Sequence, residues 1–585
     1  MWPGLGVIVL AGLVGPAPTQ GDEAARLAAL GQEIWSFRLE SDPLFATTVG
    51  DHTRDDRLTD VSPAAFGRRA EFTRGALERL QALDRSRLEP AERLNAAILE
   101  RQLQDELTAR EFRVERVPIL ADDGFHLALA QLPRQMPFVT RADYDRYLAR
   151  LRAVPAHFDQ QTAQMRAGLG EGFTQARVVL EGYQHGIASH VVADPEQSLF
   201  YEPFRSFPPS VPEGEREGLR TAGRAAIREA VVPAYERFLA FFTSEYRPGA
   251  RVTTGCSDLP RGRELYARLV RGFTTLEVTP DEVHATGLAE VARIRAEMQA
   301  TMRRAGFEGQ LPAFLKLLRE DPRFYARTPE ELLMRAAAHA KRMDGALPSL
   351  FGRLPRAPYG VEPVPDSLAP KYTGGRYVEA PPGGTRAALY WVNTYALATR
   401  PLYVLEALTL HEAVPGHHLQ IALQQELEGL PPWRRVAEVT AFVEGWALYA
   451  ERLGLEAGFY RDPWSDFGRL TYEMWRACRL VADTGLHWKG WTRQQALDYL
   501  ASNTALSLHE VETETDRYIS WPGQALAYKM GELRIRALRA RAEAELGPRF
   551  DLRRFHDAVL AQGAIPLGAL EEQIALFVER EKERP

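Results

Sequence analysis

Long stretches of this chain carry apolar residues at every third or fourth position, with Arg and Glu between them. That spacing is typical of an amphipathic α-helix with one face in a protein core. The clearest stretches are residues 24–37, 92–112, 142–169 and 212–246. Another helix is predicted to begin at Thr328-Pro329-Glu-Glu, where a capping residue is followed by a first-turn proline and first-turn acids. Helical patterns also continue from residue 404 to the C-terminus. The sequence therefore predicts a mainly α-helical body.

One segment, residues 350–394, breaks the helical pattern. It is dense in proline and contains Gly383-Gly384, which disfavours helix because proline removes a backbone donor and clashes with the preceding turn. Residues 386–393, which are aromatic and aliphatic, then have the composition of a strand. We therefore expect a small β-sheet at the start of a catalytic region, residues 350–585, that also holds metal-binding and C-terminal helices. Residues 22–349 form the predicted N-terminal helical region.

Composition narrows the classes of partner. The 585 residues include 72 Lys and Arg against 78 Asp and Glu, a formal net charge of −6. No overall basic field is available to bind nucleic acid, so we expect no nucleic-acid partner. Cys256 and Cys478, the two cysteines, are too few for a disulfide scaffold, and whether they pair with each other is left open. The oligomeric state is equally open.

The N-terminus has the pattern of a signal peptide over residues 1–21. Residues 5–14 are apolar, small and turn-forming residues follow, and charges begin at Asp22. An apolar run of this length matches a signal-peptide core, whereas spanning a bilayer takes about 20 residues. No basic residue precedes the run, which leaves a mis-annotated start or a disordered leader, and with it a cytoplasmic protein, as the alternative. The prediction is an exported protein, periplasmic or secreted, with no membrane span in the mature chain.

The chemistry concentrates in His411-Glu412-Ala-Val-Pro415-Gly416-His417-His418, which holds three of the 13 histidines. Zinc binds neutral imidazole and carboxylate groups, and a glutamate beside a ligand can take a proton from water. On a regular helix neither His417 nor His418 could share one ion with His411, because the first lies on another face and the second about 10 Å along the axis. The helix must therefore break at the Pro-Gly step. A histidine cluster without metal is the alternative.

A further candidate ligand is Glu444, a carboxylate within the strongly apolar stretch 438–451. A buried carboxylate is unfavourable unless it is paired or binds a metal. The 26 residues between His417 and Glu444 are enough for one helix to end and a second to return to the site. The alternative is a structural ion pair with one of the many arginines.

Three motifs together resemble the bacterial domain-of-unknown-function 885 family, over nearly the whole chain beyond the leader. They are His411-Glu412-x-x-Pro415-Gly416-His417, Glu444-Gly445-Trp446-Ala447-x-Tyr449-x-Glu451 and Arg517-Tyr518-x-x-x-Pro522-Gly523-Gln524-Ala525-Leu526-x-Tyr528-x-x-Gly531. The resemblance implies a mainly helical, zincin-like metallohydrolase. It is distantly similar to oligopeptidases and carboxypeptidases in which H-E-x-G-H is followed by a ligand glutamate on the next helix. Two residues are inserted before the Gly-His of this chain.

The resemblance also implies a role for each motif residue. One zinc ion per chain is held by His411, His417 and Glu444, with His418 as the rival second ligand. Glu412 is the general base, and a metal-bound water attacks the amide bond of a peptide or small amide substrate. The implied activity is that of a zinc metallopeptidase, either a carboxypeptidase or an oligopeptidase.

Other residues are candidates for substrate contacts. Tyr390 and Asn393 resemble a substrate-binding edge strand, with an ordinary core strand as the alternative. Tyr528, and after it Tyr518, could donate to the oxyanion, although a helix tyrosine is more often part of a core. Arg517 could bind a substrate carboxylate, or pair with Glu512 or Glu514.

Two other functions fit the same motifs. One is a non-catalytic helical binding protein that keeps a zincin scaffold, and the other is a metal-dependent hydrolase of small non-peptide amides or esters. The inserted pair of residues keeps the first alternative open.

Overall fold

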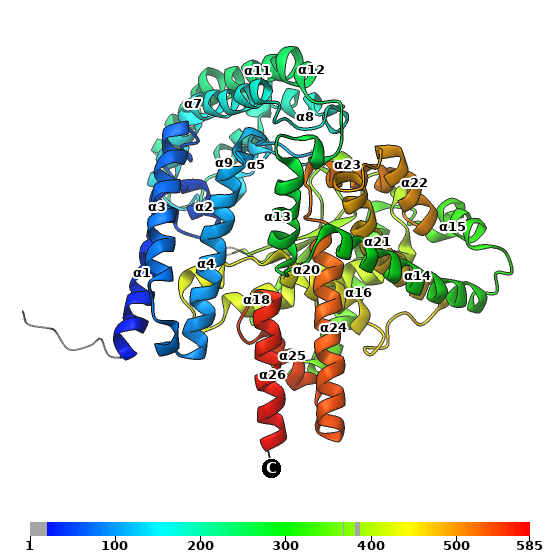
Figure 1. Ribbon diagram of the computed structural model, residues 1–585. Helices are drawn as coiled ribbons and strands as arrows, with labels where there is room; N and C mark the ends of the chain where they lie inside the picture. Colours follow the sequence, from blue (N-terminus) through cyan, green and yellow to red (C-terminus); the bar gives the residue numbers. More distant parts are fainter. Residues whose placement is uncertain (1–19, 367, 381–385, 585) are drawn as a thin grey trace, which may run out of the picture.

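The computed structural model describes residues 20–366, 368–380 and 386–584 (Figure 1). The predicted signal peptide therefore lies outside the described residues up to position 19, and the first helix begins at Gln20. The described chain is mainly helical with one small three-stranded sheet, which confirms the predicted fold class. No helix among these residues is both long enough and apolar enough to cross a bilayer.

The first part of the chain forms an arch of helices, from α1 to α12, that curves over one side of the molecule (Figure 1). Its long helices are α1 (Gln20–Ser41), α3 (Pro63–Gln81), α4 (Pro90–Glu111), α7 (Arg141–Glu171), α10 (Glu213–Ala226) and α11 (Val232–Phe241). Its short helices are α2 (Pro43–Thr48), α5 (Phe125–Ala130), α6 (Leu132–Gln135), α8 (Gln184–Ala188), α9 (Glu202–Arg205) and α12 (Arg247–Gly249). The four predicted helical stretches are all present. The last of them, 212–246, is interrupted by wide helical turns at Ile227–Val231 and Phe242–Tyr246.

The rest of the chain forms the body, from α13 to α26. Its helices are α13 (Gly262–Thr274), α14 (Pro280–Arg304), α15 (Leu311–Glu320), α16 (Pro329–Leu350), α17 (Leu405–Glu412), α18 (His417–Gln425), α19 (Pro432–Arg435), α20 (Thr440–Leu453), α21 (Pro463–His487), α22 (Arg493–Asn503), α23 (Leu508–Ser520), α24 (Leu526–Leu546), α25 (Leu552–Leu560) and α26 (Leu567–Glu583). Thr328 caps α16 as predicted, since its hydroxyl accepts from the Glu331 N–H at 3.1 Å.

Helix α21 is the centre of the body, and nearly all of its side chains are buried. Helix α14 packs along it, at a point where a Cβ on Gly287 would lie 2.7 Å from Leu480 and Val481. Residues 280–349, placed by sequence in the N-terminal region, therefore pack closely with α21 of the region 350–585. The boundary at 349/350 stays a prediction.

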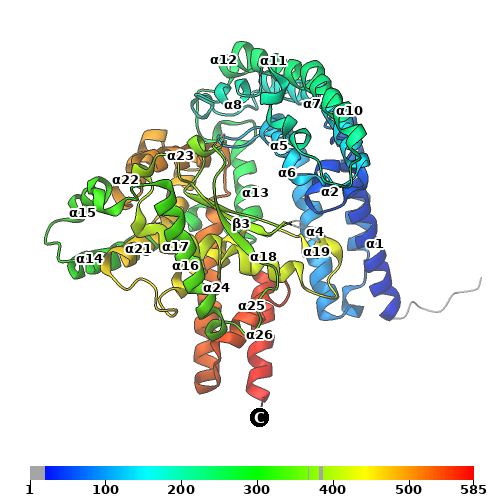
Figure 2. The ribbon, with the colours of Figure 1, turned by 180° about the vertical axis from the view of Figure 1, so that it is seen from behind.

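The sheet lies in the middle of the molecule, between the arch and the body (Figure 2). Its strands are β1 (Tyr359–Pro363), β2 (Gly375–Val378) and β3 (Ala388–Val392), in the order β1-β3-β2. Strand β3 is parallel to β1 and antiparallel to β2. The predicted strand is thus central and paired on both sides, and the expectation that Tyr390 and Asn393 lie on an edge strand is wrong. The edge nearer the histidine motif is β2.

Candidate metal centre

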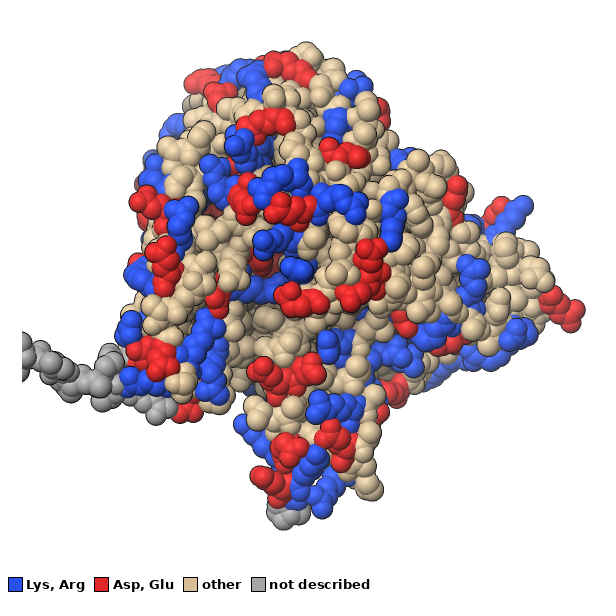
Figure 3. All heavy atoms as spheres, viewed as in Figure 1, with Lys and Arg blue, Asp and Glu red and all other residues tan. Residues whose placement is uncertain are grey.

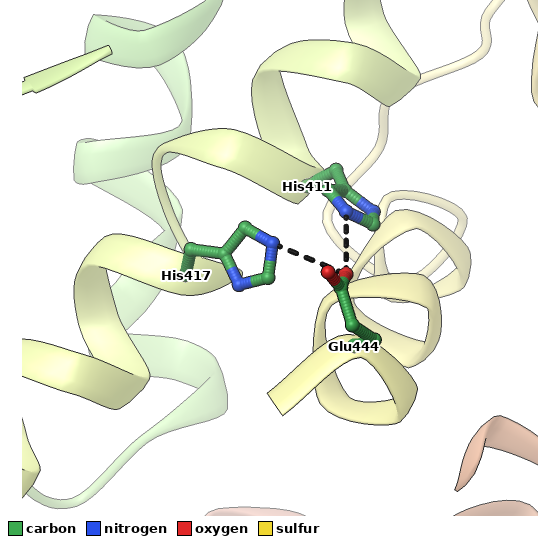
Figure 4. Close-up of side chains that lie close together, drawn as sticks. All are labelled: His411, His417 and Glu444. Carbon is green, nitrogen blue, oxygen red and sulfur yellow. Dashed lines mark ion pairs between the residues drawn. The ribbon is translucent and has the colours of Figure 1, made fainter. Parts of the chain in front are cut away.

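Three side chains of the sequence motifs meet at one point in the body (Figure 4). Glu444 Oε2 lies 3.5 Å from His411 Nε2 and 3.4 Å from His417 Nε2, and the candidate ligand atoms all lie within 4.8 Å of one another. The residues come from the end of α17, the start of α18 and the first part of α20. The structure therefore brings together the three predicted ligands.

The two histidines can meet because the helix breaks between them, as the spacing requires. Helix α17 ends at Glu412 and α18 begins at His417. The break needs Gly416, because a Cβ there would lie 1.9 Å from the carbonyl oxygen of His411. The turn is held from the next helix, where the Trp446 indole N–H donates to the Pro415 carbonyl at 2.8 Å. Trp446, two residues after Glu444, thus ties the third ligand's helix to the turn between the other two.

The donor set fits a zinc ion. In a tetrahedral site with bonds of about 2.0–2.1 Å, neighbouring donor atoms lie roughly 3.3–3.4 Å apart, close to the separations between Glu444 Oε2 and the two imidazoles. Glu444 Oε2 is buried and has no hydrogen-bond partner among the described residues. An unsatisfied buried carboxylate oxygen is unfavourable, and a divalent cation between the three side chains would satisfy it.

A second carboxylate orients the first histidine. The His411 Nδ1–H donates to Glu451 Oε1 at 2.8 Å, which leaves Nε2 facing Glu444. Glu451 is buried and is approached at 3.5 Å by Arg476. A carboxylate behind a ligand histidine fixes its tautomer and strengthens metal binding. Glu451 belongs to the second sequence motif, but no role was predicted for it.

The charges of the metal-free site are strongly coupled. Burial disfavours the charged form of His411, but the carboxylates of Glu444 and Glu451 outweigh it and raise its pKa to about 9. Burial alone would raise the pKa of Glu444, yet the two histidines hold it well below its usual range. The preferred metal-free state therefore has a protonated His411 beside an ionised Glu444.

Glu412, the predicted general base, follows His411 directly at the end of α17. Its Oε2 accepts from the Tyr377 N–H at 2.8 Å, which ties it to the outer edge of β2. This N–H points away from β3 and is free for such a contact. The side chain is largely buried, and no other hydrogen bond to it is found in the described chain.

His418, the rival second ligand, faces away from the centre. Its Nε2–H donates to the Ala357 carbonyl at 3.1 Å, and its Nδ1 accepts from the Tyr377 hydroxyl at 3.3 Å. Both ring nitrogens are occupied, and burial lowers the pKa of the ring to about 4. The structure thus places His417, and not His418, at the ligand position.

The two candidate oxyanion donors lie in different surroundings. The Tyr528 ring, on α24, stacks over the His411 ring with centroids 6.4 Å apart, and its hydroxyl accepts from Arg517 Nη2 at 3.4 Å. The Tyr518 hydroxyl is fully buried and accepts from Trp475 at 2.8 Å and from Arg479 at 3.1 Å. Only Tyr528 lies at the metal centre.

The predicted substrate residues of β3 have structural contacts. Tyr390 is buried, with its hydroxyl 3.4 Å from that of Thr409 on α17. Asn393 is also buried, and its amide donates at 3.0 Å to the carbonyls of Ala369, Tyr372 and Thr373. The Asn393 contacts hold the loop that leads into β2, and the Tyr390 contact joins β3 to α17. Both residues therefore support the elements that carry the site.

Arg517 lies beside the centre, at the end of α23. It contacts Tyr528 and, at 3.2 Å, Gln524 Oε1. Glu514 is 3.6 Å away, whereas Glu512 pairs with Arg493. Of the two ion pairs considered from sequence, the structure shows the one with Glu514. Cys256 and Cys478 are buried and do not pair.

Comparison with known proteins gives one family and its fold. A family model described as "Bacterial protein of unknown function (DUF885)" matches residues 43–574. No curated protein matches the chain. A solved structure from Colwellia psychrerythraea, described as a "putative lipoprotein", is 28% identical with a TM-score of 0.86, and the match covers 96% of this chain and 99% of that one. A second solved structure, from Shewanella oneidensis, is described as a "putative lipoprotein of unknown function". It is 17% identical with a TM-score of 0.67, and the match covers 96% of this chain and 100% of that one. At this identity the likeness shows the fold alone.

Proposed function

The chain belongs to the DUF885 family of bacterial proteins of unknown function, and from that premise we propose that it is a zinc-dependent hydrolase of peptide bonds. The observation that carries the proposal is the convergence of His411, His417 and Glu444, whose buried Oε2 has no hydrogen-bond partner among the described residues. Zinc held there would supply a Lewis acid that polarises a substrate carbonyl and acidifies water.

Glu412 is the general base of the proposed reaction. The Tyr377 N–H holds one of its oxygens, so the carboxylate has a fixed orientation next to the first ligand. It takes a proton from the attacking water and delivers it to the nitrogen of the amine that leaves. The net reaction adds water across the C–N bond.

Tyr528 is the donor for the oxyanion that develops on the attacked carbonyl. It lies against the His411 ring, and the Arg517 guanidinium beside its hydroxyl favours donation to negative charge. Strand β2 is an edge strand of the sheet beside the site, and because Glu412 already occupies its Tyr377 N–H, an extended peptide can pair with the part of this edge beyond Tyr377. A peptide is therefore favoured over a small ester as substrate.

The test is Glu412→Gln in the zinc-loaded protein. We expect turnover of a peptide library to fall by about 100- to 10,000-fold, because the base is lost, while one zinc ion per chain is retained. Glu428→Gln, an exposed carboxylate in the loop after α18, is the matched control. Mass spectrometry of the products and metal analysis give the two readouts. The proposal would be refuted if the zinc-loaded wild-type protein left every peptide intact. Turnover of small non-peptide esters or amides alone would favour the alternative of a metal-dependent hydrolase of such compounds.

We also propose that the protein is exported. Residues 5–14 have the length and composition of a signal-peptide core, and the Colwellia psychrerythraea protein is described as a lipoprotein, a class found outside the cytoplasm. Fractionation of cells that express the full chain tests this: export predicts the mature protein outside the cytoplasm, and a wholly cytoplasmic location contradicts it.

A further inference from the structure

Two arginines lie near the His411 side of the metal centre, and the first is Arg517. Its guanidinium contacts the Tyr528 hydroxyl at 3.4 Å, and Tyr528 stacks on His411. Among the described residues Glu514, at 3.6 Å, is the carboxylate within ion-pair distance of it, and Glu514 already forms a 2.7 Å pair with Arg479. Arg517 therefore keeps much of its capacity to bind an anion.

The second is Arg376, on the edge strand β2. It directly precedes Tyr377, whose N–H holds the general base Glu412. Its side chain is exposed, its only hydrogen bond goes to the Tyr372 hydroxyl at 3.5 Å, and no carboxylate lies within ion-pair distance among the described residues. The pKa of Arg376 is raised mainly by Tyr372, and burial and the charge of Arg517 oppose this rise.

Asp122, in a loop of the arch, is the acid that faces both arginines. Its charge raises the pKa of Arg376 and of Arg517, but it forms no ion pair with either in the described chain. Glu514, 3.6 Å from Arg517, and Glu438, whose pKa Arg376 lowers, add to this negative charge, so the two guanidinium groups are partly balanced. Figure 3 shows that basic and acidic side chains are otherwise interspersed over the face it presents.

Two carboxylates, Glu379 and Glu438, lie on the His417 side of the centre. Burial raises the pKa of both, and repulsion adds to the rise, from Glu438 for Glu379 and from Glu444 for Glu438. A cavity of about 490 Å³ has Ala380 and Val436, near neighbours of these residues in sequence, in its lining, together with side chains of both charges. This cavity leaves room for an extended chain on that side.

We propose that Arg376 and Arg517 bind the terminal carboxylate of a peptide substrate, so that the protein is a carboxypeptidase. This deepens the proposed function and rests on it. A guanidinium group can donate two hydrogen bonds to the two oxygens of a carboxylate. Arg376 and Arg517, next to the oxyanion donor Tyr528, would thereby place the last peptide bond at the metal centre. Hydrolysis breaks that C–N bond, water supplies the hydroxyl of the new terminal carboxylate, and the released residue leaves as an amine. The remaining peptide extends past His417 towards the cavity.

The first experiment compares two peptides of one sequence, one ending in a free acid and one in an amide. With zinc-loaded wild-type protein we expect kcat/KM for the amide to be about 10- to 100-fold lower, mostly through KM, because the amide has no charge to pair with the arginines. Equal hydrolysis of both peptides, or cleavage far from the C-terminus, overturns the inference and leaves the proposed function intact.

The second experiment assigns this preference to Arg376. Arg376→Ala should lower kcat/KM for the free acid about 10-fold or more and leave the amide unchanged, and Arg376→Lys should restore part of the loss. Arg335→Ala, on the exposed face of α16, is the control and should change neither. An equal loss for both peptides in Arg376→Ala would mean a merely structural role and would overturn the assignment.

A binding measurement separates this inference from the proposed function. By calorimetry, the metal-free protein should bind the free-acid peptide at least 10-fold more tightly than the amide, and Arg376→Ala should reduce the difference several-fold, since Arg517 remains. If no peptide is hydrolysed, the proposed function fails, and the calorimetry still decides whether the arginines recognise a carboxylate. Equal binding of the two peptides rejects that recognition.

Discussion

Gly445 of α20 and Gly531 of α24 touch through their backbones: a Cβ on Gly445 would lie 2.5 Å from the Cα atom and from the carbonyl carbon of Gly531. Gly445 follows the ligand Glu444, and Gly531 lies about one turn after Tyr528. The contact therefore sets the distance between the helix of the proposed metal ligand Glu444 and the helix of the proposed oxyanion donor Tyr528. It also explains why both motifs contain a glycine.

Gly531→Ala is expected to destabilise the protein by about 1–3 kcal/mol, because the new Cβ would lie 1.9 Å from the Ala441 carbonyl oxygen, a backbone atom that cannot turn aside. Gly345→Ala, inside α16 with no atom within 4 Å, is the control and should stabilise by about 0.5–1 kcal/mol. Urea unfolding of both variants measures the difference. Equal stability of the two would show that α20 and α24 are not held in this contact.

His417→Ala and His418→Ala should separate a metal ligand from a structural histidine. We expect His417→Ala to lose zinc, because its Nε2 faces Glu444. We expect His418→Ala to keep one zinc ion per chain and to unfold at a lower temperature, since its hydrogen bonds to Ala357 and Tyr377 are lost. Metal analysis after dialysis and thermal unfolding give the two readouts. Zinc loss in His418→Ala alone would reverse the assignment.

The sequence predicted the parts of the fold that local pattern determines. The stretch 92–112 became α4 (Pro90–Glu111), since its periodicity and first-turn proline act within the helix itself. Strand β2 was not predicted, because four residues among glycines carry no period of their own and pair only where β3 lies beside them. The position of α14 against α21 depends on contacts between distant residues, which the local sequence pattern does not show.

The candidate site likewise has parts that the sequence predicted and parts that only the structure shows. His411, His417 and Glu444 could be named from sequence because metal chemistry restricts which residue types serve as ligands. The choice between His417 and His418 depends on where the helix restarts after Gly416, which only the structure shows. From sequence, Tyr528 was the first candidate and Tyr518 the second, each on an amphipathic helix. Packing decides between them, since the Tyr518 hydroxyl is taken by Trp475 and Arg479.

Glu451→Gln should weaken zinc binding by about 10- to 100-fold without unfolding the protein, because the amide still accepts from His411 Nδ1–H but no longer carries the charge that strengthens the ligand. Competition with a chelator of known affinity measures the change. Glu428→Gln, exposed and away from the centre, should bind zinc as wild type does. An unchanged affinity in Glu451→Gln would mean that the carboxylate only fills space behind the histidine.

Zinc binding should depend on pH through His411. In the metal-free protein its pKa is raised to about 9, above the usual value near 6.5, by Glu444 and Glu451 acting against burial. The protonated ring therefore stabilises the metal-free fold below about pH 6.5, and this contribution is lost as the pH rises through about 9. Zinc needs the neutral ring, so its affinity should rise by up to tenfold per pH unit between 7 and 9 and then level off.

The same proton can be counted directly. Calorimetry in buffers of different ionisation enthalpy should show about one proton released per zinc ion at pH 7 and none above about pH 9.5, since His411 is then already neutral. In Glu451→Gln one of the two carboxylates that hold the proton is gone, so the release should disappear at a lower pH. If zinc binding to the wild type releases no proton at pH 7, His411 is already neutral in the metal-free protein. That result would contradict the charged His411–Glu444 pair described for this state.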